Sequence, residues 1–175
     1  MSGKGFRNNW DLDHNKYGVT IDIGHHEIHS GNHYTTGAFA SGYSNGNSLE
    51  LLYRTPATGS MHATFLVATD KAAFVTYYSC VGVTASGANV TSLNRNRQSG
   101  NTTDVYVGLG PTVTSYGTTM GAQWIGSSAF RSNLGGQVRG TNEWILNKDT
   151  QYIFQVAPES SSNNRISVQF DWYEL

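Results

Sequence analysis

The stretch that most restricts the fold is RISVQFDWYEL, residues 165–175, because its apolar and polar residues alternate one by one. Apolar residues occupy every second position from Ile166 to Trp172, and more polar residues fill the positions between them. Successive side chains of a strand point to opposite faces, so this pattern predicts a β-strand with one buried face and one polar face. A sheet that is buried on one side needs a second layer over that side.

The rest of the chain carries the same kind of signal in shorter runs. From Tyr17 onward, runs rich in β-branched and aromatic residues alternate with clusters of Gly, Asn and Ser, and no segment shows the apolar spacing of a helix. We therefore expect strands and no helix. The expected strands are YGVTIDI (17–23), a segment around 25–40, SLELLYRTP (48–56), MHATFLVAT (61–69), AFVTYYSCVGVT (73–84), TDVYVGLG (103–110), WILN (144–147), QYIFQVAP (151–158) and RISVQFDWYEL (165–175).

Eight or more strands without a sequence repeat favour an all-β, antiparallel two-sheet β-sandwich or jelly roll, with an up-and-down barrel as the main alternative. We expect a single domain of this kind over residues 17–175. Its last two strands are predicted to form a hairpin, since PESSSNN between them has the composition of a turn. Residues 111–140 are rich in Gly and Ser but contain Trp124, which indicates an ordered excursion from the sandwich.

The first 16 residues are mostly polar, and Phe6, Trp10 and Leu12 are the residues that could anchor them. The sequence predicts an N-terminal arm over residues 1–16. Such an arm either docks on a neighbouring subunit, with Trp10 as an anchor, or frays as an untethered terminus.

The charge content restricts the partners. Lys and Arg number 11 and Asp and Glu number 12, and charged residues make up 13% of the chain. A chain this neutral has no field that would gather nucleic acid or an anionic membrane, and we expect neither as a partner. The sequence shows neither a membrane span nor a signal peptide, which predicts synthesis in a cytoplasm. The single Cys80 lies in an apolar run and is expected to be a buried, inert thiol.

Four of the six histidines lie in GHHEIHSGNHY, residues 24–34. On a strand, His25, Glu27 and His29 would share one face, and two histidines in this arrangement can chelate a metal. The segment H-E-I-H is one residue short of the helical zinc-protease motif, and no further ligands can be assigned.

We therefore expect no bound metal and no cofactor at this cluster, and no catalytic residues. A metal-dependent enzyme is kept as an alternative hypothesis. The preferred interpretation is a polar segment at a subunit contact, with His25, Glu27 and His29 partly buried there and His33 as a further interface candidate.

Two further features are candidates for a protein interface. Arg95 and Arg97 lie in SLNRNRQSG (92–100), which is expected to be a hairpin loop with two exposed guanidinium groups that clamp carboxylates or are simply solvated. Trp124 is the third candidate, and together with exposed tyrosines it could also stack on sugars. No nucleophile motif or phosphate loop is present, which argues against an enzyme.

Five short motifs follow one another in a fixed order, and this order resembles a family of small virion proteins of tailed bacteriophages. The family shares an H-E-I-H-x-G-x-H-[FY] stretch, a polar strand leading to a T-P turn, an N-R-N-R loop and a final E-W-I-L…T-x-Y…W-Y-E. The resemblance spans about residues 20–175. The matching segments here are HEIHSGNHY (26–34), LLYRTP (51–56), LNRNRQS (93–99), NEWILNKDTQYIF (142–154) and FDWYEL (170–175).

The resemblance implies a non-enzymatic structural protein of the phage particle, a head decoration or cement protein that binds the major capsid protein lattice. It further implies a β-sandwich homotrimer at the capsid surface of the virion, made in the host cytoplasm. Trimerisation would also cover sheet edges that a single sandwich exposes. The alternative function is a tail-associated adhesion or carbohydrate-binding module.

Overall fold

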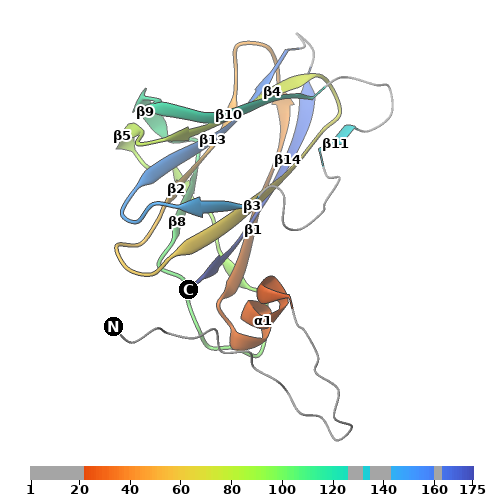
Figure 1. Ribbon diagram of the computed structural model, residues 1–175. Helices are drawn as coiled ribbons and strands as arrows, with labels where there is room; N and C mark the ends of the chain where they lie inside the picture. Colours follow the sequence, from red (N-terminus) through yellow and green to blue (C-terminus); the bar gives the residue numbers. More distant parts are fainter. Residues whose placement is uncertain (1–21, 126–131, 135–142, 160–162) are drawn as a thin grey trace, which may run out of the picture.

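A computed structural model of the chain describes residues 22–125, 132–134, 143–159 and 163–175. These residues form two antiparallel sheets packed face to face, with one short helix at one end of the sandwich (Figure 1). The predicted all-β sandwich is confirmed. In this part of the chain no helix is long and apolar enough to cross a membrane.

The strands that were expected from the sequence are mostly present, with changed bounds and with additional short strands. The elements are α1 (Ile23–Ser30), β1 (His33–Tyr43), β2 (Leu49–Arg54), β3 (Met61–Thr69), β4 (Ala73–Ser79), β5 (Gly82–Ala85), β6 (Ala88–Asn89), β7 (Leu93–Asn94), β8 (Tyr106–Leu109), β9 (Thr112–Ser115), β10 (Thr118–Ile125), β11 (Ser132–Leu134), β12 (Trp144–Leu146), β13 (Gln151–Pro158) and β14 (Asn164–Glu174).

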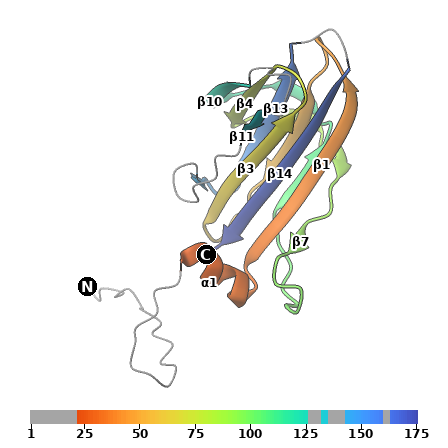
Figure 2. The same ribbon diagram turned by 90° about the vertical axis from the view of Figure 1, so that its right-hand side faces the viewer.

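Two large sheets make up the sandwich. Sheet A has the order β11-β3-β14-β1-β7, and β12 pairs with the same strand β3. Sheet B has the order β10-β4-β13-β2-β8-β6, while β5 and β9 form a small separate sheet. Figure 2 shows β3, β14 and β1 of sheet A side by side, with β7 along the outer edge of β1.

The pairing of eight of these strands is nested. The strand β1 pairs with β14, β2 with β13, β3 with β12, and β4 with β10. A long hairpin that is rolled up over itself gives this order, and it places alternate pairs in opposite sheets. The result is the winding of a jelly roll.

The predicted hairpin between the last two strands is wrong. The strand β13 lies in sheet B between β2 and β4, whereas β14 lies in sheet A between β1 and β3. Each strand therefore has partners on both sides, and PESSSNN connects the two sheets instead of closing a hairpin. A turn composition does not show whether the two strands that it separates belong to the same sheet.

The alternation that defined the last strand is confirmed. Ile166, Val168, Phe170 and Trp172 are each at most 2% exposed. The Phe170 ring lies 4.9 Å from the ring of Tyr53, which comes from the opposite sheet. Burial of such side chains contributes roughly 1.5–3 kcal/mol each to the free energy of unfolding. This aromatic layer is therefore a major hydrophobic contact between the two sheets.

Three other expectations change. The run 73–84 is not one strand, because the chain turns at Cys80 (φ 57°) between β4 and β5, and the Cys80 side chain is exposed instead of buried. Trp124 belongs to β10 in sheet B and not to an excursion from the sandwich. The arm 1–16, Trp10 and most of the expected strand 17–23 lie outside the described residues.

Candidate interface at the helix end of the sandwich

The histidine-rich segment is a helix and not the strand that was expected. Asp22 caps α1, since its Oδ1 accepts a hydrogen bond from the Nα of His25 at 3.2 Å. Gly31 ends the helix in the left-handed conformation (φ 77°), and its N–H donates to the carbonyl of Ile28 at 3.1 Å. An Asp N-cap and a Gly C-cap eight helical residues apart were the available signals in the sequence.

The helix changes which side chains share a face. Side chains four positions apart lie above one another on a helix, so His25 and His29 come together, with their Nε2 atoms 3.0 Å apart at the exposed surface. Glu27 points the other way and is 5% exposed. The expected common face of His25, Glu27 and His29 is therefore wrong.

Glu27 is held inside the chain by its neighbours. Its carboxylate accepts hydrogen bonds from Nδ1 of His26 at 3.0 Å and from Nδ2 of Asn32 at 3.2 Å. A buried carboxylate is stable only when it is paired in this way. Glu27 thus fixes α1 against the start of β1.

A second polar cluster lies next to the helix, around Tyr173. The Tyr173 ring stacks between the imidazoles of His33 and His62, with ring centroids 5.9 and 4.7 Å away. Its hydroxyl donates to Glu143, and Nδ1 of His62 is within hydrogen-bonding distance of both groups. Burial raises the pKa of Tyr173 well above its usual value, and the hydrogen bond to Glu143 and the charge of Glu143 add smaller increases. His33 is 5% exposed, so its ring packs inside the chain and not on its surface.

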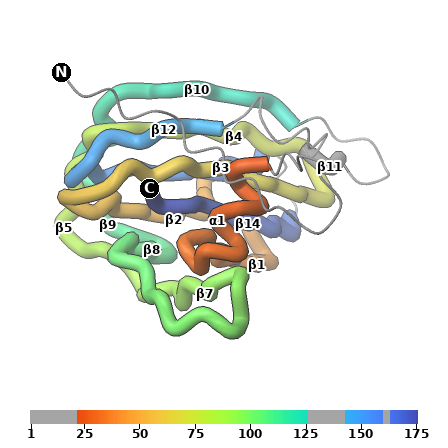
Figure 3. Tube along the Cα trace, turned by 60° about the horizontal axis from the view of Figure 1, so that its bottom comes forward, coloured from red at the N-terminus to blue at the C-terminus, as the bar shows by residue number. Residues whose placement is uncertain are grey.

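The N-R-N-R segment packs directly on α1. The side-chain amide of Asn96 donates to the carbonyl of His29 at 3.1 Å, and the main-chain N–H of Arg95 donates to the carbonyl of His33 at 2.8 Å. Figure 3, with this end turned forward, shows α1 beside the segment that carries β7. The expected hairpin loop is wrong, because the segment connects β7 in sheet A to β8 in sheet B.

The two arginines differ in their surroundings. The guanidinium of Arg95 lies 3.9 Å from the carboxylate of Asp171, which is a weak ion pair on the surface of sheet A. Arg97 is exposed, as expected from the sequence. Of the pair, Arg97 is therefore the guanidinium that is available to a partner.

Segments from all over the chain meet at this end. We call it the helix end, and it comprises Asp22–Asn32, Leu93–Asn101 and Tyr173–Leu175 together with His62 and Glu143. HEIHSGNHY, LNRNRQS and FDWYEL contribute the main contacts, and Glu143 comes from NEWILNKDTQYIF. The chain ends described here, Asp22 and Leu175, both lie at this end (Figure 1).

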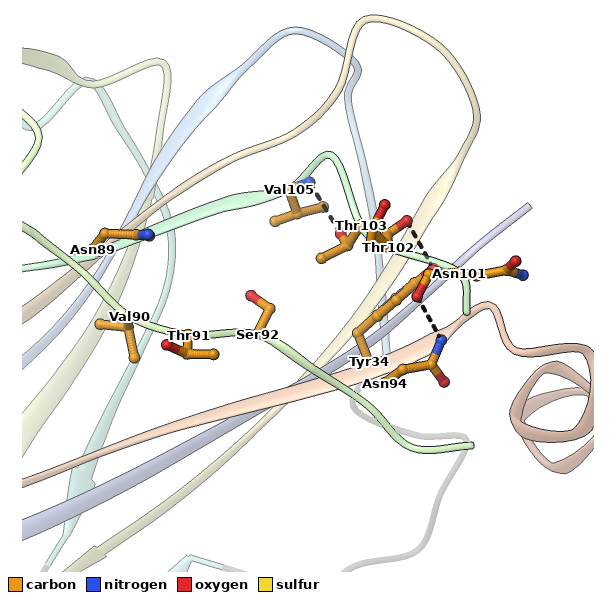
Figure 4. A pocket seen from close by; sticks show the side chains of 10 residues that line it. All are labelled: Tyr34, Asn89, Val90, Thr91, Ser92, Asn94, Asn101, Thr102, Thr103 and Val105. Atoms are coloured by element: carbon orange, nitrogen blue, oxygen red, sulfur yellow. Dashed lines mark hydrogen bonds between the residues drawn. The ribbon is translucent and has the colours of Figure 1, made fainter. Parts of the chain in front are cut away.

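A cavity of about 310 Å³ opens beside the helix end, between β7 and the residues that lead into β8 (Figure 4). The hydroxyl of Tyr34 donates to the carbonyl of Thr102 at its rim, at 3.0 Å. The lining is neutral and rich in hydroxyl and amide groups: Tyr34, Asn89, Val90, Thr91, Ser92, Asn94, Asn101, Thr102, Thr103 and Val105. Such a lining suits a neutral polar group.

Trp124 lies far from the helix end in the fold, on the outer face of sheet B. It is paired in register with Phe74, and the two side chains are 59% and 43% exposed. Its indole N–H donates to Glu159 at 2.7 Å, which fixes the ring orientation. Two positions further along the same face, Gln155 donates to Glu50 at 2.6 Å.

The described residues contain no group of three or more His, Cys, Asp or Glu side chains that could hold a metal ion. Comparison of the chain with protein-family models, with curated proteins and with solved structures finds no match. The structure thus defines the chain as a jelly roll of two antiparallel sheets with a polar, helix-bearing end.

Proposed function

We propose that the chain is a non-enzymatic structural protein of a tailed-phage virion, a head decoration or cement protein that binds and stabilises the major capsid protein lattice. The observation that carries the proposal is the convergence of the resembling motifs. HEIHSGNHY, LNRNRQS and FDWYEL lie far apart in the sequence, yet they form the helix end together. Three of the five resembling motifs therefore meet at one place in the fold, whereas LLYRTP lies in sheet B.

The helix end has the chemistry of a protein-binding surface. It exposes Ile23 at 52% and Leu93 at 47%, and beside these apolar groups it exposes His25, His29 and Arg97. Apolar side chains interspersed with Arg and other polar groups are typical of interfaces between folded proteins. Asp22, the first described residue, lies at the helix end, and we propose that the arm over residues 1–16 acts on the same partner.

The architecture is compatible with this role. Jelly rolls occur in viral capsid domains, although the fold alone does not decide function. In the proposed assembly three copies form a trimer on the capsid surface, and each copy presents its helix end to the major capsid protein.

The test uses phage particles that lack this protein and purified chain added back to them. We expect the chain to co-sediment with particles in a copy number that approaches that of the capsid subunits. The substitution Arg97→Glu should lower the affinity at least tenfold, because it reverses a charge at the contact. The matched control is Arg165→Glu, which reverses the same charge on an exposed arginine that pairs with Ser41 near the other end of β1.

Two results would contradict the proposal. One is a virion copy number near that of tail fibres, measured by mass spectrometry of purified particles. The other is equal binding by the Arg97→Glu variant and the wild-type chain, which would remove the helix end from the contact.

Carbohydrate binding is the second candidate function, and the outer face of sheet B favours it. The exposed pair Trp124 and Phe74 provides an apolar platform, and the Glu50–Gln155 pair lies beside it. Sugar rings pack on aromatic faces while carboxylates and amides bind their hydroxyls. A glycan array tests this function: Trp124→Ala should abolish specific binding, whereas Phe39→Ala, which removes an exposed aromatic ring from sheet A, should not.

A further inference from the structure

The pair His25 and His29 has the geometry of a bidentate metal site. Both side chains are exposed on successive turns of α1, their Nε2 atoms are 3.0 Å apart, and the rings meet at 60°. Two imidazole nitrogens that bind one tetrahedral Zn²⁺ at about 2.0–2.1 Å lie roughly 3.3 Å apart. Small rotations of the two side chains therefore suffice to admit an ion between them.

We propose that His25 and His29 bind one divalent transition-metal ion through their Nε2 atoms, with water in the remaining coordination positions. In the metal-free protein one Nε2–H donates to the other Nε2. The ion takes the place of this shared proton, and each neutral ring then carries its proton on Nδ1. This inference does not depend on the proposed function.

The spacing of the two ligands equals that in helical zinc-protease motifs, but the carboxylate differs. In H-E-x-x-H the glutamate follows the first histidine directly. Here Glu27 is two positions after His25, and it is buried against His26 and Asn32 on the opposite side of α1. Glu27 is therefore not placed to act as a general base on a water bound to this ion.

The ligand set decides which ions bind. Imidazole nitrogen favours Zn²⁺, Ni²⁺ and Cu²⁺, with Cu²⁺ the tightest, whereas Mg²⁺ and Ca²⁺ prefer oxygen ligands. Only the neutral imidazole binds a metal ion, so protons compete with the ion for the two nitrogens.

Isothermal titration of the full chain, without an added histidine tag, with Ni²⁺ and separately with Zn²⁺ tests the proposal. We expect one ion per chain, and at least tenfold weaker binding in His25→Asn and in His29→Asn. His26→Asn is the matched control, because it removes a histidine of the same helix whose Nδ1 is directed to Glu27. Its affinity should stay within about twofold of the wild type.

A second measurement guards against misfolding. In ¹H–¹⁵N spectra of the wild type, Ni²⁺ should broaden resonances of Ile23–Ser30 first, and the far-UV spectra of all three variants should match the wild type. The proposal is wrong if neither ion binds at up to about 1 mM. It is also wrong if His26→Asn loses as much affinity as His25→Asn, or if broadening centres on another part of the protein.

Discussion

The side-chain amide of Asn94 donates a hydrogen bond to the carbonyl of Gly31 at 2.8 Å and thereby joins β7 to the end of α1. The same amide also donates to the carbonyl of Asn101 at 3.1 Å, and the Asn94 Oδ1 accepts from the N–H of Asn96 at 2.9 Å. One side chain thus connects three segments of the helix end.

Replacing this connector should loosen the helix end. Asn94→Ala leaves carbonyl groups of Gly31 and Asn101 without their donor, and we expect a loss of about 1–2 kcal/mol in the free energy of unfolding. Urea denaturation measures it, with Asn45→Ala as the control for a turn at the opposite end. Equal midpoints for the two variants would contradict the assigned role of Asn94.

Gly31 is expected to tolerate no side chain, for two separate reasons. Its φ of 77° is unfavourable for other residues, and an added Cβ would lie 2.2 Å from the Oγ of Ser99. We expect Gly31→Ala to destabilise the protein by about 2–4 kcal/mol. Gly46→Ala shares the positive φ (93°) but has open space around the Cβ, so it reports the conformational strain alone.

The steric part of this effect can be isolated. Combining Gly31→Ala with Ser99→Gly removes the clashing side chain, so the double variant should recover part of the lost stability. If the loss of stability in the double variant equals the sum of the losses in the two single variants, Ser99 does not restrict Gly31.

The hydroxyl of Tyr173 is expected to stabilise the packing of β14 against β3 and Glu143. Tyr173→Phe removes its hydrogen bond to Glu143 and its contact with His62, and it should lower the free energy of unfolding by about 1–3 kcal/mol. The control Tyr43→Phe removes a hydroxyl at the other end of β1. Thermal denaturation of the two variants compares them, and a larger loss in Tyr43→Phe would contradict the prediction.

Stability should fall in alkaline solution. Burial raises the pKa of Tyr77 to about 12, and burial together with the hydrogen bond to Glu50 raises the pKa of Tyr116 to about 12. The usual tyrosine pKa in an unfolded chain is about 10. Above pH 10 the unfolded chain therefore releases protons that the folded chain retains, so the stability present below pH 10 declines between pH 10 and 12.

Urea midpoints at pH 8, 10 and 11 measure this decline. Tyr77→Phe should make the decline shallower, because it removes one of the groups that titrate differently in the two states. A midpoint that stays constant from pH 8 to 11 would rule out this linkage.

The β-sandwich was predictable because its signal is local. Each residue of β14 faces either the core or the surface, and the alternation from Ile166 to Trp172 records this directly. The sequence of helix α1 shows no comparable pattern of apolar residues. Its buried positions are Gly24 and Glu27, so it has no apolar stripe. The capping residues Asp22 and Gly31 were its only sequence signals.

The candidate site was harder to predict for the same reason. Choosing a strand for residues 25–40 placed His25 and Glu27 on one face, whereas the helix separates them and brings His29 to His25. Which strands pair is also not encoded locally. Nothing within 151–175 shows that β13 and β14 belong to opposite sheets, since that depends on their partners β2 and β1 far away in the sequence.

The pairing of β1 with β14 has a consequence for how the molecule is made. During synthesis β1 leaves the ribosome long before β14 is made. The main-chain N–H and C=O groups of β1 that pair with β14 therefore stay unpaired until β14 emerges. Such distant pairings slow folding and expose nascent chains to aggregation. The helix end, which includes the last residues of β14, is completed only when synthesis has passed Glu174.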